Sequence, residues 1–224
     1  MQLKKDYKIV VTSGPTREFI DPIRYISNPS TGKMGYYIAK AAVNSGFPVT
    51  YIAGPVDSEF AKVDEATNIS VLSTQDMLDA VLKSITNNCV LIMAAAPADY
   101  RPAKRYEVKM KKTDSPDIHL VPNPDILQTV NLYRDAKGIR NLHLIGFAAE
   151  THDTDKYALE KLQKKNLDMI FLNDLTRKDS GFGVNTNQLT VFYRNGKKEV
   201  WPPMAKEKLG YQIIREIEQW LPSL

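Results

Sequence analysis

Residues Lys8–Gly35 read KIVVTSGPTREFIDPIRYISNPSTGKMG and decide the class of the fold. The first part, Lys8–Ser13, is an apolar run rich in β-branched residues, which predicts a buried strand. A loop with three prolines, Gly14–Thr31, follows it, and a segment of helical period, Lys33–Ser45, comes next. A buried strand, a long loop and a helix in this order are typical of the first βα unit of an α/β protein.

The same alternation continues along the chain and predicts βα units over a mostly parallel sheet. The expected strands are Lys8–Ser13, Val49–Ala53, Ile69–Ser73, Cys89–Ala95, Leu142–Phe147 and Met169–Leu172. The expected helices are Lys33–Ser45, Thr74–Thr86, Pro124–Tyr133, Asp155–Lys165 and Ala205–Trp220. We therefore predict a Rossmann-like, three-layer α/β fold that forms a single domain over residues 1–224.

An antiparallel element is expected near the C-terminus. Asn195-Gly196 lies between two runs of alternating apolar residues, Gln188–Tyr193 and Glu199–Trp201. Asn-Gly in this position is the strongest short-range signal of a β-hairpin. We therefore expect a C-terminal antiparallel hairpin that extends the sheet before the last helix.

Two stretches do not fit the alternation of strands and helices. Gly14–Thr31 and Tyr100–Asn123 each contain three prolines, and the second is rich in lysine. Loops longer than about 15 residues are uncommon in compact domains and usually carry function or move. Both follow the carboxyl end of an apolar strand, where open α/β sheets bind ligands. We therefore expect the ligand site at these loops, and we expect residues 101–119 to be mobile without ligand.

The composition argues against several classes of protein. Of 224 residues, 43% are hydrophobic, and 30 basic residues against 26 acidic residues give a net charge of +4. This excess suits phosphorylated substrates but is too small and too evenly spread to predict nucleic-acid binding. No apolar run approaches the roughly 20 residues that span a bilayer. We therefore expect no nucleic-acid partner and no membrane partner.

The N-terminus and the cysteine content predict a cytoplasmic location. Met1–Lys8 is polar and leads directly into a strand, so no signal peptide is visible. Cys89 is the only cysteine, which excludes a disulfide within the chain and a thiolate zinc site. The three histidines do not have metal-ligand spacing.

The first group of candidate site residues surrounds Asn28. Ser30 or Thr31 can cap the following helix, and the glycines of Gly32–Gly35 let backbone N–H groups approach an anion at its N-terminus. A plain capped helix after a turn explains the same residues. The spacing is not that of a Walker loop, because a methionine replaces the required hydroxyl residue, and no G-x-G-x-x-G is present.

The second group follows the strand that ends at Ala95. The small residues Ala94–Ala96 leave room for a flat base or a sugar, and Asp99 can accept a hydrogen bond from a ribose hydroxyl or help to hold Mg²⁺. A lysine cluster, Lys109–Lys112, suits the neutralisation of a reacting phosphate. The alternative for these lysines is a solvated basic loop.

The third group comes from the second half of the chain. Asn123 can cap a helix that has Pro124 in its first turn. Phe147, at a strand end, can pack on a base or fill the core. Lys161 and Lys165 are one helical turn apart and can point at one ligand or form a solvated helix face.

A dehydrogenase is the second enzymatic hypothesis. Tyr157 and Lys161 have the Y-x-x-x-K spacing of short-chain dehydrogenases, as do Tyr36 and Lys40. The serine that these enzymes place upstream is missing from Arg140–Glu150, and so is the glycine fingerprint. The sequence therefore favours another activity.

Taken together, the three groups resemble the phosphopantothenoylcysteine synthetase family, also called phosphopantothenate–cysteine ligases. The family is the synthetase half of the bacterial bifunctional coenzyme A biosynthesis protein. Its pattern runs close to T-[AS]-G-P-T-R-E, N-x-S-[ST]-G-K-M-G, A-A-V-A-D, K-[IM]-K-K, N-P-D-I, G-F-A-A-E-T, K-L-x-x-K and N-D. This chain supplies these blocks in order between Thr12 and Asp174. Pro29, Thr31 and Pro97 stand where the bacterial members often have His, Ser and Val.

The resemblance implies a ligase that joins 4′-phosphopantothenate to cysteine. The carboxylate would attack the α-phosphate of CTP and give an acyl-cytidylate and pyrophosphate, and the amine of cysteine would then displace CMP. Mg²⁺ would bridge the triphosphate. CTP rests on the resemblance alone, because the residues by themselves do not distinguish it from ATP. A homodimer is implied as well, and a separate decarboxylase is expected to act next because the chain begins at the synthetase strand.

The resemblance also implies roles for single residues. Asn28 would orient the acyl-nucleotide, Lys109 would stabilise charge on the α-phosphate, and Arg24 would position substrate or cysteine. The nucleotide-binding residues would be Gly14, Ala94, Ala95, Ala96, Asp99, Lys109, Asn123, Pro124, Asp125, Ile126, Phe147, Lys161 and Lys165. No metal ligand is assigned, and Asp99 is the candidate for Mg²⁺. A nucleotide-binding module without turnover is the non-enzymatic alternative.

Overall fold

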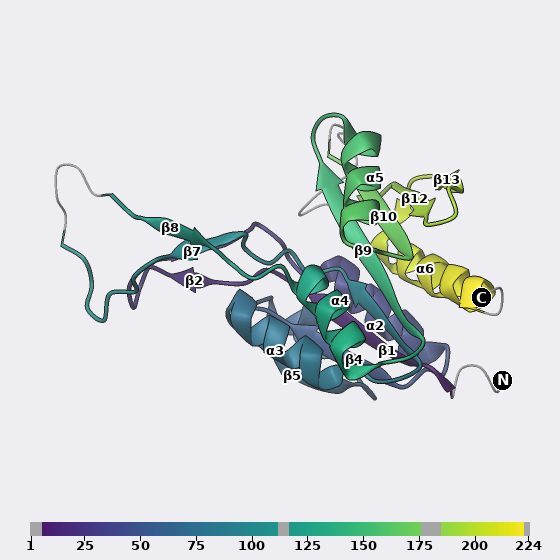
Figure 1. The fold of residues 1–224 in the computed structure, drawn as a ribbon, viewed down its shortest axis with the longest axis horizontal. Helices are drawn as coiled ribbons and strands as arrows, with labels where there is room; N and C mark the ends of the chain where they lie inside the picture. Colours follow the sequence, from purple (N-terminus) through teal and green to yellow (C-terminus); the bar gives the residue numbers. More distant parts are fainter. Residues whose placement is uncertain (1–5, 112–116, 176–184, 222–224) are drawn as a thin grey trace.

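An eight-stranded sheet forms the centre of the molecule (Figure 1). The computed structural model describes residues 6–111, 117–175 and 185–221. From one edge of the sheet to the other, the strands are β13 (Lys198–Val200), β12 (Leu189–Tyr193), β10 (Met169–Asp174), β9 (Leu142–Glu150), β6 (Cys89–Met93), β1 (Lys8–Ser13), β4 (Val49–Ala53) and β5 (Thr67–Ser70). The strands from β10 to β5 are parallel, and β12 and β13 add the predicted antiparallel hairpin.

Helices cover both faces of this sheet, as a parallel sheet requires. On one face lie α2 (Lys33–Asn44) and α6 (Lys206–Trp220), and on the other lie α3 (Thr74–Ser84), α4 (Ile126–Lys137) and α5 (Thr154–Lys164). The central strand β1 is buried on both sides, with Ile9, Val10 and Val11 fully inaccessible to solvent. The predicted Rossmann-like, three-layer α/β class is confirmed.

Several predicted ends of elements are wrong for local reasons. The strand expected to end at Ser73 ends at Ser70, because Ser73 is the N-cap of α3 and forms a capping box with Asp76. The helix expected at Pro124–Tyr133 begins and ends later, because Asp125 caps α4 and Gly138 ends it with a φ of 62°. The strands β9 and β10 continue beyond their predicted ends to Glu150 and Asp174, because each pairs with the other over this length.

The expectation that the two long segments lack regular structure is wrong in part. The first contains a small ribbon of β2 (Glu18–Phe19) and β3 (Tyr25–Ile26), and the second contains a ribbon of β7 (Tyr100–Pro102) and β8 (Leu120–Pro122). These ribbons lie side by side and form an arm that projects from the sheet (Figure 1). Lys112 lies outside the described residues, as does part of the segment expected to be mobile.

The start of α2 corrects a predicted cap. Its N-cap is Gly32, with a φ of 78° and no side-chain cap, rather than Ser30 or Thr31. One turn into the helix, a Cβ on Gly35 would lie 2.6 Å from the Cβ of Ser13 and 2.9 Å from the carbonyl oxygen of Thr12. Glycine at this position therefore lets α2 approach the end of β1, where the pocket described below opens.

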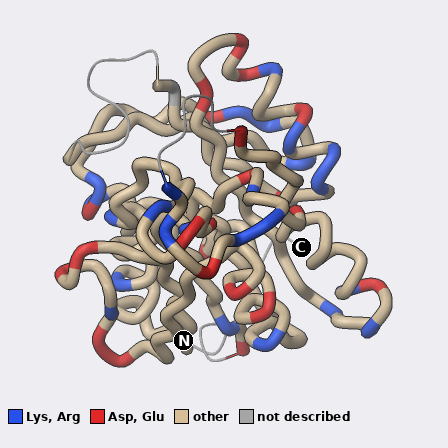
Figure 2. The backbone as a smooth tube through the Cα atoms, turned by 90° about the vertical axis from the view of Figure 1, so that its left-hand side faces the viewer, with Lys and Arg blue, Asp and Glu red and all other residues tan. Residues whose placement is uncertain are grey.

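The smaller elements complete the chain. They are a 3₁₀ turn (Ser58–Phe60) and the paired short strands β11 (Thr186–Asn187) and β14 (Met204–Ala205). Within the described ranges, no helix is long and apolar enough to cross a membrane. Figure 2 views the backbone from the side on which the arm projects. Basic and acidic residues are interspersed in this view, and neither charge forms a large continuous region.

Candidate functional site

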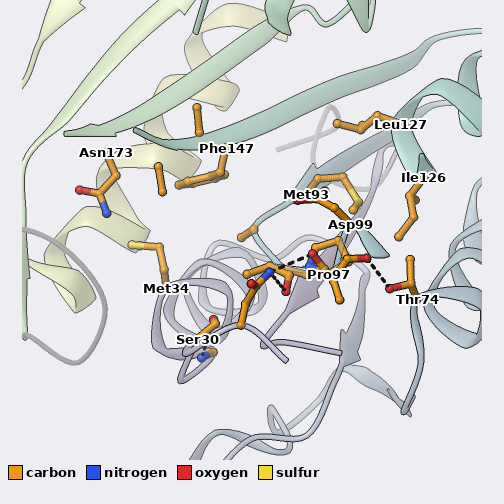
Figure 3. Close-up of a pocket in the computed structure, with 18 of the residues that line it drawn as sticks. Ser30, Met34, Thr74, Met93, Pro97, Asp99, Ile126, Leu127, Phe147 and Asn173 are labelled. Atoms are coloured by element: carbon orange, nitrogen blue, oxygen red, sulfur yellow. Dashed lines mark hydrogen bonds between the residues drawn. The ribbon is translucent and has the colours of Figure 1, made fainter. Parts of the chain in front are cut away.

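A pocket of about 670 Å³ opens where the central parallel strands end. Phe147 and Asn173, from β9 and β10, lie on one side of it, and Ser30 and Met34 lie opposite, at the start of α2 (Figure 3). The floor is formed by the last residue of β6 and the segment after it, from Met93 to Asp99. The pocket therefore occupies the position at which open α/β sheets bind ligands.

The structure brings most of the predicted site residues together. Those that line the pocket are Asn28, Ala94, Ala95, Ala96, Asp99, Asn123, Pro124, Asp125, Ile126, Phe147, Lys161 and Lys165. Gly14, Arg24 and Lys109 are not among the lining residues. Gly14 lies beneath the floor, where its carbonyl accepts a hydrogen bond of 2.9 Å from the Ala96 N–H.

Asn28 is anchored to the floor of the pocket. Its Nδ2 donates to the carbonyl oxygens of Ala96, at 3.2 Å, and of Pro97, at 3.0 Å. Both amide hydrogens are therefore engaged, and Oδ1 is the atom of this side chain that accepts hydrogen bonds. Pro97 has no N–H, and at this position of the loop its carbonyl carries the contact with Asn28.

Asn123 has a different position from the one predicted. The cap of α4 is Asp125, which accepts a hydrogen bond of 3.1 Å from the Gln128 N–H, and not Asn123. Asn123 instead donates from Nδ2 to the Ala98 carbonyl at 2.8 Å, and its Oδ1 accepts from Arg101 at 3.1 Å. Its side chain thus joins the floor of the pocket to the start of α4.

Two lysines, one in the last turn of α5 and one at its C-cap, supply positive charge to the pocket wall. Lys161 donates to the Phe147 carbonyl at 2.7 Å, and Lys165 pairs with Asp125 at 3.0 Å. Burial, followed by repulsion from Lys165, lowers the pKa of Lys161. Burial acts to raise the pKa of Asp125, but the hydrogen bonds from Lys165 and Gln128 outweigh it and the net pKa is lowered. An anionic ligand would relieve the repulsion between the two lysines.

Among the lining residues that sequence analysis did not single out are three polar ones from distant parts of the chain, Thr74, Asn187 and Lys206. Thr74 begins the helix after β5. It could have been predicted as a site residue, because the carboxyl ends of parallel strands meet at one edge of the sheet. Lys206 begins the last helix and is only 5% exposed, and burial and the nearby Lys33 lower its pKa. No sequence signal links the end of the chain to this pocket, because the link depends on α6 packing beside α2.

Arg24 and Lys109 lie on the arm rather than in the pocket wall. The Nε and Nη2 atoms of Arg24 both donate to the Asp21 carboxylate. Nη2 also donates to the Met110 carbonyl at 3.0 Å. The Met110 N–H in turn donates to Asp21 at 3.1 Å. The residue next to Lys109 is thereby bound to the turn between β2 and β3.

The pocket has the chemistry of a site that binds and orients charged substrates. Burial raises the pKa of Cys89 to about 11, so this thiol is not an activated nucleophile. Tyr157 does not line the pocket although Lys161 does, which argues against the dehydrogenase pair. In the part of the chain that the structure describes, no three His, Cys, Asp or Glu side chains are grouped to hold a metal ion.

Comparison with known proteins gives one family and several close relatives. Residues 4–221 match the family described as DFP, the DNA/pantothenate metabolism flavoprotein C-terminal domain. The chain is 41% identical over 217 residues to the coenzyme A biosynthesis bifunctional protein CoaBC of Vibrio vulnificus, covering 96% of this chain and 52% of that protein. It is 42% identical over 210 residues to CoaBC of Bacillus subtilis, covering 93% of this chain and 50% of that protein. The chain thus spans about half the length of these relatives.

Solved structures agree with the fold. The C-terminal domain of a coenzyme A biosynthesis bifunctional protein CoaBC matches with a TM-score of 0.79 and 35% identity, and the match covers 100% of both chains. A Cab2 variant in complex with phosphopantothenate-cysteine has a TM-score of 0.69 at 16% identity, covering 99% of this chain and 90% of that one. The second likeness concerns the fold alone.

Proposed function

Because the chain belongs to the family of DNA/pantothenate metabolism flavoprotein C-terminal domains, we propose that it is a phosphopantothenate–cysteine ligase of coenzyme A biosynthesis. The observation that carries this proposal is the pocket at the strand ends, with Asn28 in its floor and Lys161 and Lys165 in its wall. Asn28 and the two lysines come from two separate motifs of the sequence, and they meet around one cavity with Ala94–Ala96 from a third. Similarity to CoaBC over nearly the whole chain supports the same activity.

The proposed reaction has two steps, and the substrates supply the nucleophile in each, so no nucleophile from the protein is needed. The carboxylate of 4′-phosphopantothenate attacks the α-phosphate of CTP, forming an acyl-cytidylate as the α–β phosphoanhydride bond breaks and pyrophosphate leaves. The amine of cysteine then attacks the acyl carbon, forming the amide as CMP leaves and the amine loses a proton. Catalysis of this kind depends on positioning and charge neutralisation.

The chain's own residues divide these tasks. In our proposal Lys161 and Lys165 attract the nucleotide, Asn28 accepts a hydrogen bond that orients the acyl-nucleotide, and Lys109 neutralises charge on the α-phosphate. Mg²⁺ commonly binds through one or two carboxylates together with substrate phosphates. Asp99 lines the pocket together with Asp125 and Glu150, and its carboxylate fits a Mg²⁺ that arrives with the triphosphate.

The position of Lys109 bears on the oligomeric state. Lys109 and Arg24 lie outside the pocket of their own chain, on a projecting arm. We therefore include a homodimer in the proposal, in which the arm of one copy completes the site of the other. A cytoplasmic location and decarboxylation of the product as the next step also belong to it.

A pyrophosphate-release assay tests the activity. The chain is mixed with 4′-phosphopantothenate and CTP, with and without cysteine, and the amide product is identified by mass spectrometry. We expect release that depends on phosphopantothenate, formation of CMP and product with cysteine, and a preference for CTP over ATP of at least about tenfold in kcat/KM, or about 1.4 kcal/mol. Equal turnover with ATP would contradict the assignment of CTP as the nucleotide, but it would not contradict the ligase activity.

The alternatives give different results in the same experiment. Binding of CTP without any pyrophosphate release would favour a nucleotide-binding module, and NAD(P)H binding without release would favour an oxidoreductase. Lys161→Ala should weaken CTP binding, whereas Lys164→Ala is the matched control, because Lys164 is exposed on the same helix and does not line the pocket.

A further inference from the structure

Two buried threonines from distant parts of the chain meet beneath the pocket. Thr16 follows β1 and Thr74 begins α3, and their side chains are 0% and 1% exposed. Their hydroxyl oxygens are 2.9 Å apart. Thr74 lines the pocket but Thr16 does not. The proposed reaction assigns no chemistry to either residue.

The two hydroxyls close a ring of hydrogen bonds around Ala98. The Ala98 N–H donates to Thr16 Oγ1 at 2.9 Å, and Thr74 Oγ1 donates to the Ala98 carbonyl at 3.2 Å. A threonine hydroxyl has one hydrogen to donate, so with Thr74 bonded to Ala98 the bond between the threonines runs from Thr16 to Thr74. Each donor in the ring is then satisfied.

This ring is one half of a clamp on the pocket floor. From the other side, Asn28 donates to the carbonyls of Ala96 and Pro97. The Thr16 carbonyl also accepts from the Ser27 hydroxyl at 2.7 Å, directly beside Asn28. Beyond the ring, the Asn123 N–H donates to the Asp99 carbonyl at 2.8 Å. The backbone from Ala96 to Asp99 is therefore fixed at every residue.

We propose that Thr16 and Thr74 are positioning residues for the reaction, acting through Ala98 to place Asp99 and the two carbonyls that orient Asn28. The inference rests on the proposed ligase function. Thr16→Val leaves the buried Ala98 N–H without its partner, and Thr74→Val leaves the buried Thr16 hydroxyl without its acceptor. Buried polar groups that lose a hydrogen-bond partner cost free energy, so the loop shifts in either variant. A displacement of about 1 Å at an active site can lower a rate about 10²-fold.

Thr16→Val is the sharpest test, because Thr16 does not line the pocket and its effect must pass through the ring. We expect Thr16→Val and Thr74→Val to lower kcat about 10- to 100-fold. KM for CTP should change by less than about threefold, because the lysines that attract the nucleotide stay in place. Thr16→Ser and Thr74→Ser keep the hydroxyl and should restore kcat to within about threefold of the original.

The control is Ser84→Ala, which removes a buried hydroxyl bond of 2.7 Å to Ala80 at the far end of α3. It should lower the melting temperature without changing kcat. Amide exchange measured by NMR provides a reading that is independent of activity, and Ala98 should exchange faster in Thr16→Val. Wild-type kcat in both valine variants of an active enzyme would overturn the inference, as would serine variants no better than the valine variants. Absence of pyrophosphate release by the unaltered chain would instead overturn the proposed function.

Discussion

At the residue scale, the position of Asn28 changes what its replacement should do. Its Nδ2 is bonded to two carbonyls of the pocket floor, so the amide both holds the loop and presents Oδ1 to a ligand. An aspartate has the same shape but donates nothing, and its charge would face the carbonyls of Ala96 and Pro97. The residue therefore contributes to structure and to orientation at once.

We predict that Asn28→Asp and Lys109→Gln separate the two half-reactions. Lys109→Gln should lower pyrophosphate release about 10²- to 10³-fold even without cysteine, because charge on the α-phosphate develops in the first step. Asn28→Asp should still form acyl-cytidylate but retain it poorly and pass it slowly to cysteine. A quench experiment with labelled phosphopantothenate, with and without cysteine, measures both steps.

Asn68→Asp is the matched control for this pair. Asn68 also donates from Nδ2 to two carbonyls, those of Val63 and Ala66, but it does not line the pocket. Its replacement should affect stability and leave the partition between the two steps unchanged. Accumulation of intermediate in Lys109→Gln, together with none in Asn28→Asp, would mean that the two roles are reversed.

Lys161 should make nucleotide binding depend on pH. Burial holds its pKa below the usual 10.5. Only the protonated amine attracts phosphate, so CTP affinity should fall as pH rises through this lowered pKa. Lys161→Met should weaken binding about tenfold, or about 1.4 kcal/mol, and remove that dependence. Titration calorimetry at a series of pH values below 10.5 measures this dependence, and an unchanged profile in Lys161→Met would contradict the assignment.

At the scale of elements, the arm is held by one carboxylate. Asp21 accepts hydrogen bonds from the N–H groups of Ile23, Arg24 and Met110 as well as from the Arg24 guanidinium. The Arg24 side chain, followed by the backbone N–H groups, holds the pKa of Asp21 well below its usual value against the opposing effect of burial. The turn between β2 and β3 and the segment that carries Lys109 are therefore coupled through this residue.

We predict that Asp21→Asn loosens the Lys109 segment without unfolding the sheet. A carboxyl with a lowered pKa stabilises the fold above its unfolded pKa, and this contribution is lost as pH falls through the folded pKa. The melting temperature of the variant should therefore lie below that of the original at pH 6 to 8, and the difference should shrink below about pH 4. Amide exchange at Met110 should be faster at neutral pH. Asp79→Asn, on the exposed side of α3, should show neither effect.

At the scale of the whole molecule, the arm carries exposed apolar side chains that suit contact with a second copy. Ile23 is 60% exposed, Tyr100 is 55% exposed and Val108 is 76% exposed. Light scattering should therefore give twice the chain mass of 25.3 kDa. Val108→Asp should favour the monomer. Leu132→Asp, at a 68% exposed position on α4, is the control and should not.

Complementation tests whether a site is shared between two copies. Lys109→Gln and Asn28→Asp chains are each impaired alone, but co-expression should restore about a quarter of the activity. Half of randomly paired dimers contain one chain of each kind, and one of the two sites in such a dimer is intact. Recovery requires that Lys109 of one copy acts on the pocket of the other. Dimers that form without any recovery would show that Lys109 serves its own chain.

The sequence by itself determined the order of strands and helices, the antiparallel hairpin and the edge of the sheet at which the pocket lies. These follow from local periodicity, from turn chemistry at Asn195-Gly196 and from the rule that parallel strands end at one edge. Most residues that line the pocket could also be predicted, because the motifs that contain them come directly after strands. The helix caps were less predictable, because several polar residues near each start compete for the role.

Only the tertiary structure decided which side chains support the site and which lie away from it. Thr16 and Thr74 are separated by 58 positions and Asn28 and Ala96 by 68, so their contacts depend on the packing of whole elements. Lys206 reaches the pocket because α6 packs beside α2, and Lys109 lies outside it because its segment binds Asp21 on the arm. Periodicity reports which face of an element is buried, but it does not report which distant group each buried polar atom meets.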